Sequence, residues 1–165
     1  MIWKISPKKS DDLIEQLLIN RGISKKEQEF FFNPKILDFQ NDLNSNQIKK
    51  AQERIFLAIK NNESIIIYGD YDVDGISASA ILYKSLVSLG AKVLPYIPHR
   101  EKEGYGLSKL GLDYIKTTNT SLIITVDCGI VAIEQASYAK QLGLDLIITD
   151  HHLPLDTLPE AFAIV

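Results

Sequence analysis

Three aspartates at alternate positions are the residues of this sequence whose type and spacing point most directly to chemistry. Asp70, Asp72 and Asp74 lie in the segment YGDYDVDG, directly after the apolar run SIII. Like charges this close repel one another unless a cation lies among them. A solvated turn is the simple alternative, because Asp and Gly favour turns, but a turn does not need three alternating aspartates. The segment therefore indicates a metal site.

A calcium-binding EF-hand loop is a second alternative, since Asp-x-Asp-x-Asp-Gly matches its first six positions. The twelfth position of such a loop requires a bidentate Glu, and counting from Asp70 this position is Ile81. The preceding segment also has the pattern of a strand rather than a helix. We therefore favour a metal site at a strand end, where extended geometry would turn Asp72 and Asp74 toward one ion.

Two further segments carry residues suited to the same chemistry. Asp127 lies in VDCGI, although an aspartate after a strand can also simply cap the next helix. Asp150 is followed by His151 and His152, two of the three histidines of the chain. Imidazoles beside carboxylates suit manganese or another transition ion, with magnesium as an alternative. Cys128, a lone small thiol, is expected to pack rather than to react.

The charged segment PHREKEGYG, residues 98–106, contains the candidates for substrate binding. His99 and Arg100 are suited to bind a phosphate group, and glycines such as Gly104 let backbone amides approach an anion. Tyr105 lies between two glycines and completes this candidate set. The alternative is a charged loop in solvent.

The pattern of apolar residues predicts how these segments are positioned. After residue 62, short apolar runs alternate with helical stretches, which is typical of βαβ units and a parallel sheet. The expected strands are residues 65–68, 93–97, 122–126 and 144–148, and the expected helices between them are residues 77–89, 108–116 and 131–142. Each candidate segment follows one of these strands. We therefore expect an α/β fold whose site residues meet at the carboxyl edge of a Rossmann-like parallel sheet.

The part of the chain before this sheet is expected to be helical. The expected helices are residues 11–20, a second helix capped by Ser24 with Glu27 three residues on, and residues 46–60. We predict a helical N-terminal segment over residues 1–62, followed by an α/β domain over residues 63–165.

Composition and missing motifs exclude several classes of protein. With 165 residues, 45% of them hydrophobic and 24% charged, the chain has the size and composition of one globular domain. A single cysteine and the lack of a long apolar run predict a reducing cytoplasm and no membrane partner. The net charge of -3 gives no general attraction for nucleic acid, so metals or local groups must hold a polyanion. The P-loop, dinucleotide-binding, Gly-x-Ser-x-Gly and His-Glu-x-x-His motifs are absent.

The three acidic segments, in this order on a parallel sheet, resemble motifs one to three of the DHH phosphoesterase superfamily. Within it, the strings YGDYDVDGISASAIL, IPHREKEGYGLS and LLINRGI are similar to the RecJ branch of single-stranded-DNA exonucleases. The resemblance implies that residues 63–165 are part of a DHH domain. It also implies that His152 contacts phosphate and that Asp70 and Asp150 support catalysis. The residues that match metal-ligand positions are Asp72, Asp74, Asp127 and His151.

The resemblance also implies a function. It implies two divalent cations, Mn²⁺ or Mg²⁺, and hydrolysis of single-stranded DNA from the 5′ end in repair and recombination, with a single-stranded-DNA-binding protein and a helicase as partners. The alternatives are a DHH enzyme for short oligonucleotides, cyclic dinucleotides or pyrophosphate, and a non-catalytic Cdc45-like scaffold. Tyr68 stands where pyrophosphatase members have a histidine ligand, which favours the RecJ branch.

RecJ-like proteins carry two further parts after these motifs. One is a fourth motif with another metal-binding aspartate, and the other is a second domain, DHHA1, that helps to hold nucleic acid. The sequence ends at Val165, before both. We therefore expect a truncated N-terminal part, whose own metal binding and activity are left open.

Overall fold

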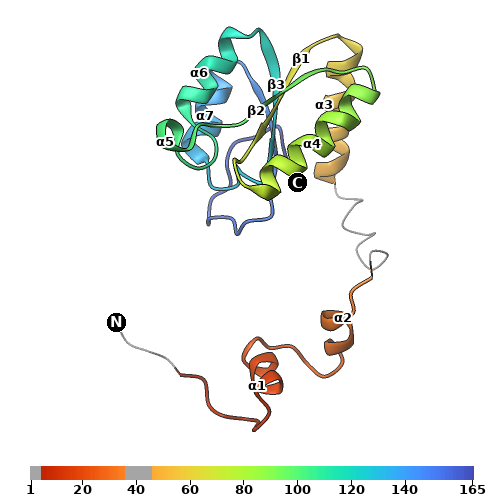
Figure 1. Cartoon of the computed structure of the whole chain (residues 1–165), viewed down its shortest axis with the longest axis vertical. Coiled ribbons are helices and arrows are strands. Elements are labelled where there is room, and N and C mark those ends of the chain that lie inside the picture. The colour runs from red at the N-terminus through yellow and green to blue at the C-terminus, as the bar shows by residue number, and fades with distance from the viewer. Residues whose placement is uncertain (1–4, 36–45) are drawn as a thin grey trace. The chain divides into compact units, whose positions relative to one another are not determined.

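The computed structural model describes residues 5–35 and 46–165. The chain divides into two compact units, residues 1–43 and residues 44–165 (Figure 1). Residues 36–45 of the expected helical region lie outside the described residues.

Within residues 5–35, the described part of the N-terminal unit, the chain forms two short helices, α1 (Leu13–Asn20) and α2 (Gln28–Phe32). Asp12 caps α1, because its side chain accepts a hydrogen bond from the backbone amide of Glu15. One half of the expected capping box before α2 forms, since the Ser24 amide donates to the Glu27 carboxylate over 2.8 Å. The regular helix begins only after Glu27.

The second unit is built on a parallel sheet. Its strands are β1 (Ser64–Gly69), β2 (Lys92–Tyr96), β3 (Thr120–Val126), β4 (Asp145–Thr149) and the two-residue β5 (Ala163–Ile164). They lie in the order β2-β1-β3-β4-β5, and every neighbouring pair is parallel. The expected α/β fold with a parallel Rossmann-like sheet is confirmed, and each expected strand is found within two residues of its predicted bounds.

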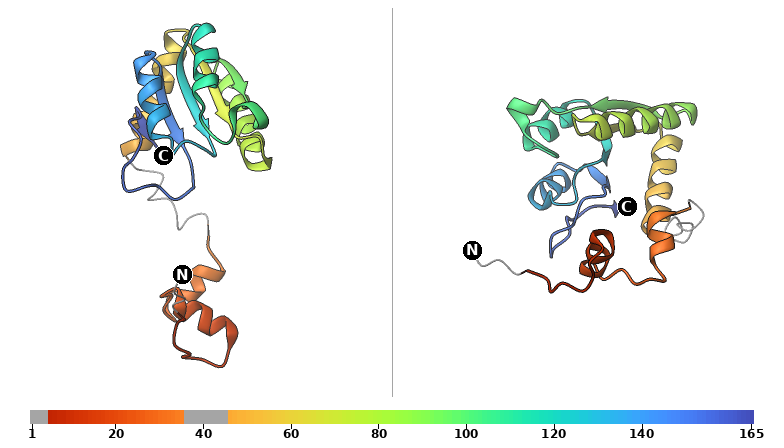
Figure 2. Two further views of the ribbon diagram at one scale, coloured as in Figure 1. Left: turned by 90° about the vertical axis from the view of Figure 1, so that its left-hand side faces the viewer. Right: turned by 60° about the horizontal axis from the view of Figure 1, so that its bottom comes forward.

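Helices cover both faces of this sheet (Figures 1 and 2). They are α3 (Asn46–Lys60), α4 (Val73–Ser88), α5 (Arg100–Glu103), α6 (Lys109–Thr117) and α7 (Ile133–Gln141). Alternate residues of β1 point to opposite faces, as in any strand. Ile65 and Ile67 pack in one core with residues of α3 and α4, whereas Ile66 and Tyr68 pack in another with residues of α6 and α7. The sheet is therefore buried on both sides, which explains its nearly continuous apolar strands.

Helix α3 belongs to the same compact unit as the sheet. The side chain of Gln47, in its first turn, accepts a hydrogen bond from the backbone amide of Ile164 in β5. The domain boundary expected at residue 62 stays a prediction. In the part of the chain that the structure describes, no helix combines the length and the apolar character needed to span a membrane.

A buried arginine ties α3 to the start of two strands. The side chain of Arg54 is 8% exposed, and it donates hydrogen bonds to Asp145 over 2.6 Å and to Glu63 over 2.7 Å. Burial opposes the charged guanidinium, but the two carboxylates outweigh this effect and raise the pKa of Arg54. The pKa of Glu63 is lowered, first by a hydrogen bond from Ser121 in β3. The ion pairs thus join α3 to the amino-terminal ends of β1 and β4, opposite the carboxyl ends that the site segments follow.

We predict that Arg54→Met lowers the free energy of unfolding by about 1–3 kcal/mol, because it leaves two partly buried carboxylates without their cation. Urea unfolding followed by circular dichroism measures this loss. Lys49→Met, at an exposed position of the same helix, is the matched control and should change stability by about 0.5 kcal/mol or less. Equal effects of the two substitutions would contradict a structural role for the Arg54 ion pairs.

Candidate metal centre

The register of the sheet brings three aspartates side by side. Gly69 of β1 pairs with Val126 of β3, and Val126 pairs with Thr149 of β4. The residues that follow these three strand ends are Asp70, Asp127 and Asp150. In a sheet of order 2-1-3-4-5, the crevice between the ends of β1 and β3 is the expected ligand site, because the chain leaves toward opposite faces there. The predicted convergence of the first, third and fourth segments is confirmed.

Asp72 and Asp74 do not lie on an extended strand. Helix α4 begins at Val73, four residues earlier than expected, so Asp72 is its N-cap and Asp74 its second residue. One oxygen of Asp72 accepts hydrogen bonds from the backbone amides of Asp74 and Gly75, both over 3.0 Å. The expectation that extended geometry turns both side chains toward one ion is therefore wrong. The role of Asp74 as a ligand stays a prediction.

Gly75 explains why the helix begins so close to the strand. A Cβ atom at this position would lie 2.5 Å from the backbone oxygen of Asp70 and 2.6 Å from its backbone nitrogen. Such contacts are too short for any side chain, so only glycine lets the first turn of α4 pack on the end of β1. The glycine of the Asp-x-Asp-x-Asp-Gly segment thus lets the helix capped by Asp72 begin against the backbone of Asp70.

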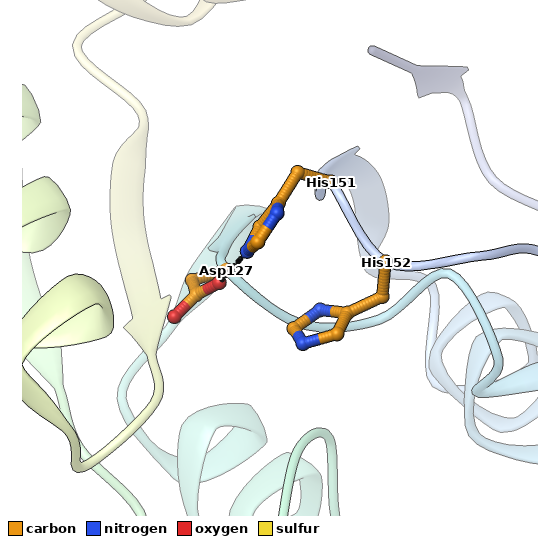
Figure 3. A group of neighbouring side chains, drawn as sticks. All are labelled: Asp127, His151 and His152. Atoms are coloured by element: carbon orange, nitrogen blue, oxygen red, sulfur yellow. Dashed lines mark ion pairs between the residues drawn. The ribbon is translucent and has the colours of Figure 1, made fainter. Parts of the chain in front are cut away.

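Asp127 has a left-handed backbone, with φ of 61°. Aspartate tolerates this conformation better than most residues, and it turns the chain sharply after β3. The Asp127 side chain is 8% exposed, and its Oδ1 lies 3.0 Å from Nε2 of His151 (Figure 3). Burial, and next the negative charge of Asp72, raise the pKa of Asp127, while the two histidines oppose this shift. The carboxylate is therefore in an environment that favours a nearby positive charge.

Asp150 shapes the turn that carries the two histidines. Its side chain is 2% exposed. One oxygen accepts hydrogen bonds from the amides of His151 and His152, and the other from the amide of Ile130. Nδ1 of His152 also lies 2.7 Å from the first oxygen. Burial opposes ionisation of Asp150, but these hydrogen bonds outweigh it and lower the pKa, while the Asp150 contact raises the pKa of His152. This arrangement fits the supporting role expected for Asp150.

Two groups of candidate ligands share Asp127. One consists of Asp70, Asp72 and Asp127, and the other of Asp127, His151 and His152; within each group, one ligand atom per residue lies within 4.8 Å of the others. Oδ1 of Asp70 is buried and has no hydrogen-bond partner among residues 5–35 and 46–165, whereas the buried Oδ1 of Asp127 faces Nε2 of His151 at 3.0 Å. Buried carboxylate oxygens without donors are costly unless a cation satisfies them. The carboxylate and imidazole donors therefore fit divalent cations.

The cluster borders an open cleft of about 580 Å³. Asp74 and Ala78 of α4 line it on one side, with Asp127 at the end of β3 and His151 on the loop after β4. Asp74 is thus close to the cluster without belonging to either ligand group. A substrate would have room to approach the shared aspartate from this side.

The structure places the substrate-binding candidates unequally. The Tyr105 hydroxyl lies 3.3 Å from the backbone oxygen of Asp127 and 3.4 Å from Nδ1 of His152, so Tyr105 reaches the cluster. Arg100 lies over the ring of Tyr71, in the acidic loop itself, at 5.2 Å. The side chain of His99 is exposed at the N-cap of α5. Phosphate contacts by these residues and by Gly104 stay predictions.

Three neighbouring residues refine the sequence analysis. Cys128 is fully buried and its thiol pKa is raised by burial, which fits packing rather than reaction. The Tyr68 hydroxyl donates to the backbone oxygen of Gly106, and burial raises the pKa of Tyr68 to about 12. Sequence reasoning missed Glu103, which stabilises the short helix α5 where a loop was expected. Its signal was hidden, because it is one of several charged residues in that segment.

A family model described as "DHH family, N-terminal domain" matches residues 64–165, more than half of the chain. The chain belongs to the DHH family. This membership agrees with the geometry, since the matched region contains both ligand groups. In this DHH chain the strand register explains why the three motif aspartates lie close together. Asp70, Asp127 and Asp150 each come directly after one of the paired residues that end β1, β3 and β4.

Among curated proteins, this DHH chain is similar to single-stranded-DNA-specific exonucleases RecJ. It is 46% identical to that of Bacillus subtilis (strain 168) over 154 residues, which cover 93% of this chain and 20% of the relative. It is 36% identical to that of Escherichia coli (strain K12) over 161 residues, 96% of this chain and 27% of the relative. The chain thus spans only one fifth to just over one quarter of these relatives.

Solved structures give the same result. A crystal structure of exonuclease RecJ bound to manganese aligns with a TM-score of 0.66 at 36% identity, over 73% of this chain and 31% of that one. The structure of RecJ in complex with Mn²⁺ from Thermus thermophilus aligns with a TM-score of 0.63 at 30% identity, over 89% of this chain and 20% of that one. The resemblance to the RecJ branch is confirmed.

We predict that Gly75→Ala destabilises the protein by about 1–3 kcal/mol, because the new methyl group overlaps the backbone of Asp70. A loss of stability would be diagnostic, since alanine normally stabilises a helix relative to glycine. Ser77→Ala, at an exposed position of the same helix, should leave stability unchanged or slightly raised. Thermal unfolding of the three proteins measures the difference. A Gly75→Ala protein as stable as the wild type would show that α4 does not need this close approach.

Proposed function

We propose that this chain supplies the metal-binding part of a RecJ-like exonuclease, which hydrolyses the phosphodiester bonds of single-stranded DNA from the 5′ end in repair and recombination. The observation that carries the proposal is the convergence of two ligand groups on Asp127 at the switch point of the sheet. The similarity to RecJ exonucleases supports the substrate class. Hydrolysis of phosphodiester bonds is a reaction that divalent ions in a carboxylate-rich site support.

The cofactors would be two divalent cations, Mn²⁺ or Mg²⁺, the ions named with the similar RecJ structures. The residues that would hold them are Asp72, Asp74, Asp127 and His151, with Asp70 beside them. When bound, such ions polarise phosphoryl oxygens and lower the pKa of a bound water. The acidic residues would thereby let a protein of net charge -3 approach a polyanion.

Other residues would position the substrate. The Asp150 carboxylate accepts from Nδ1–H of His152 and favours the imidazolium form of the ring, whose Nε2–H would donate to a phosphate oxygen. The Tyr105 hydroxyl, in contact with the same ring, would order it further. Arg100, stacked on Tyr71 at the acidic loop, would attract the phosphate charge from the other side. His99 would add a second donor on α5.

The setting of the enzyme belongs to the same proposal. A cytoplasmic location and cooperation with a single-stranded-DNA-binding protein and a helicase would follow from membership of the RecJ branch. A non-catalytic scaffold would not need the intact set of Asp72, Asp127 and His151. The position of Tyr68, whose hydroxyl bonds to Gly106 and not to the cluster, argues against a pyrophosphatase-type ligand set.

We predict that this chain binds Mn²⁺ in calorimetry and that Asp72→Asn/Asp127→Asn abolishes the binding. Asparagine keeps the N-cap at position 72 and tolerates the left-handed backbone at position 127, so the double substitution removes charge with little effect on the fold. Asp156→Asn, at an exposed position, removes one charge as a control and should bind Mn²⁺ like the wild type. Binding that survives in the double variant would place the cation elsewhere and contradict the site.

Hydrolysis needs a separate experiment. In a chimera, this chain would replace the matching N-terminal fifth of Bacillus subtilis RecJ, to which it is 46% identical. The chimera should release nucleotides from the 5′ end of a labelled single strand in Mn²⁺, and a chimera with the double substitution should not. A folded chimera that binds Mn²⁺ but cleaves only short oligonucleotides would favour the alternative DHH activity. A chimera that binds single strands without cleavage would favour the scaffold.

A further inference from the structure

Glu103 accepts hydrogen bonds from three different elements. Its Oε1 accepts from the backbone amide of His99 over 2.8 Å, and its Oε2 from the hydroxyls of Tyr96 over 2.9 Å and Ser108 over 2.7 Å. Tyr96 ends β2, His99 precedes α5 and Ser108 is the N-cap of α6. The carboxylate therefore fixes both ends of the segment between β2 and α6.

The surroundings of Glu103 favour its charged form. Burial opposes ionisation, but the bonds from His99, Ser108 and Tyr96 outweigh it, and the pKa of Glu103 is lowered. The pKa of Tyr96 is raised, by burial first and then by its hydrogen bond to Glu103. Ser108 in turn accepts from the amide of Gly111, so the contact continues into the first turn of α6. These bonds form one connected network, which is sensitive to the loss of a single member.

The segment that Glu103 fixes carries the candidate substrate contacts. Arg100 begins α5, and Tyr105 lies between Gly104 and Gly106, whose φ angles of 79° and 74° are positive. Glycine is the residue that adopts this backbone without strain, so Tyr105 is held on a sharp double bend. The bend directs its hydroxyl to Asp127 and His152. A shift of the segment would therefore move Tyr105 away from the cluster.

We propose that Glu103 is a positioning residue for single-stranded DNA: it holds Arg100 and Tyr105 at the edge of the metal cluster and does not touch the substrate itself. The inference rests on the proposed function, because it assigns the substrate contacts to that site. Under this proposal, substrate affinity depends on the segment between β2 and α6, whereas metal affinity depends on the residues at the strand ends. Glu103 is not within either group of candidate ligands.

A purely electrostatic role makes the opposite prediction. A carboxylate near a phosphate-binding segment repels DNA, so removal of its charge alone would tighten binding. Glu103→Ala and Glu103→Gln would then act alike. Under the positioning role they differ, because the Gln amide can accept from the His99 amide and donate to the two hydroxyls. Glu101, exposed on the same short helix, offers a matched charge control.

Hydrogen exchange on the 165-residue chain tests the positioning without any need for catalysis. Glu103→Ala should speed the exchange of amides 99–108 by about tenfold or more, while the amides of β1 and β3 keep their protection. Glu103→Gln and Glu101→Ala should stay within about twofold of the wild type. Unchanged exchange in Glu103→Ala would overturn the inference. If that variant does not fold, Tyr96→Phe, which removes one of the three donors, decides by the same comparison.

Kinetics of the chimera test the consequence for the substrate. Glu103→Ala should raise KM for single-stranded DNA by about tenfold or more, with Mn²⁺ affinity unchanged, and Glu103→Gln should restore most of the loss. Tighter substrate binding in both variants would establish the electrostatic role and overturn the positioning role. An unsubstituted chimera that does not cleave would count against the proposed function alone, since the exchange comparison still decides the role of Glu103.

Discussion

The central constraint on this structure is the repulsion among three carboxylates, those of Asp70, Asp72 and Asp127, whose ligand atoms lie within 4.8 Å of one another. A fold can hold such a group only if other interactions fix the backbone on each side of it. The parallel sheet does this, because its strands are buried on both faces and their register aligns the residues after β1 and β3. The cluster is therefore made by the fold, and its charge is suited to divalent cations.

Around this cluster, candidate functional residues lie in two parts of the fold, the ends of the strands with the start of α4, and the segment between β2 and α6. The candidate ligands follow strand ends or begin α4. Of the candidate substrate contacts, Arg100 and Tyr105 lie on the segment between β2 and α6, whereas His152 lies beside the candidate ligands after β4. Each part has its own organising carboxylate, Asp150 for the histidine turn and Glu103 for the α5 segment. Both accept several hydrogen bonds, and both are charged groups that stabilise irregular backbone.

The sequence predicted the sheet and the convergence of its strand ends well, because apolar runs separated by helical stretches dictate a parallel sheet, which gathers such residues at one edge. The sequence did not predict the features that depend on tertiary contacts. The start of α4 depends on the close approach of Gly75 to Asp70, which no periodicity reveals. The helix α5 depends on Glu103, whose partners Tyr96 and Ser108 come from other elements. The buried ion pairs of Arg54 were missed for the same reason.

Paramagnetic broadening by Mn²⁺ in amide NMR spectra of this chain tests the central claim most directly. At substoichiometric Mn²⁺, we expect signals of residues 70–75, 127–130 and 150–152 to broaden together, since these three segments surround one centre. The amide signals of Arg54, Glu63 and Asp145, which lie at the other end of the strands, should stay sharp. Broadening centred on another acidic segment, such as Glu101 to Glu103, or in only one of the three segments, would contradict a shared metal centre at the strand ends.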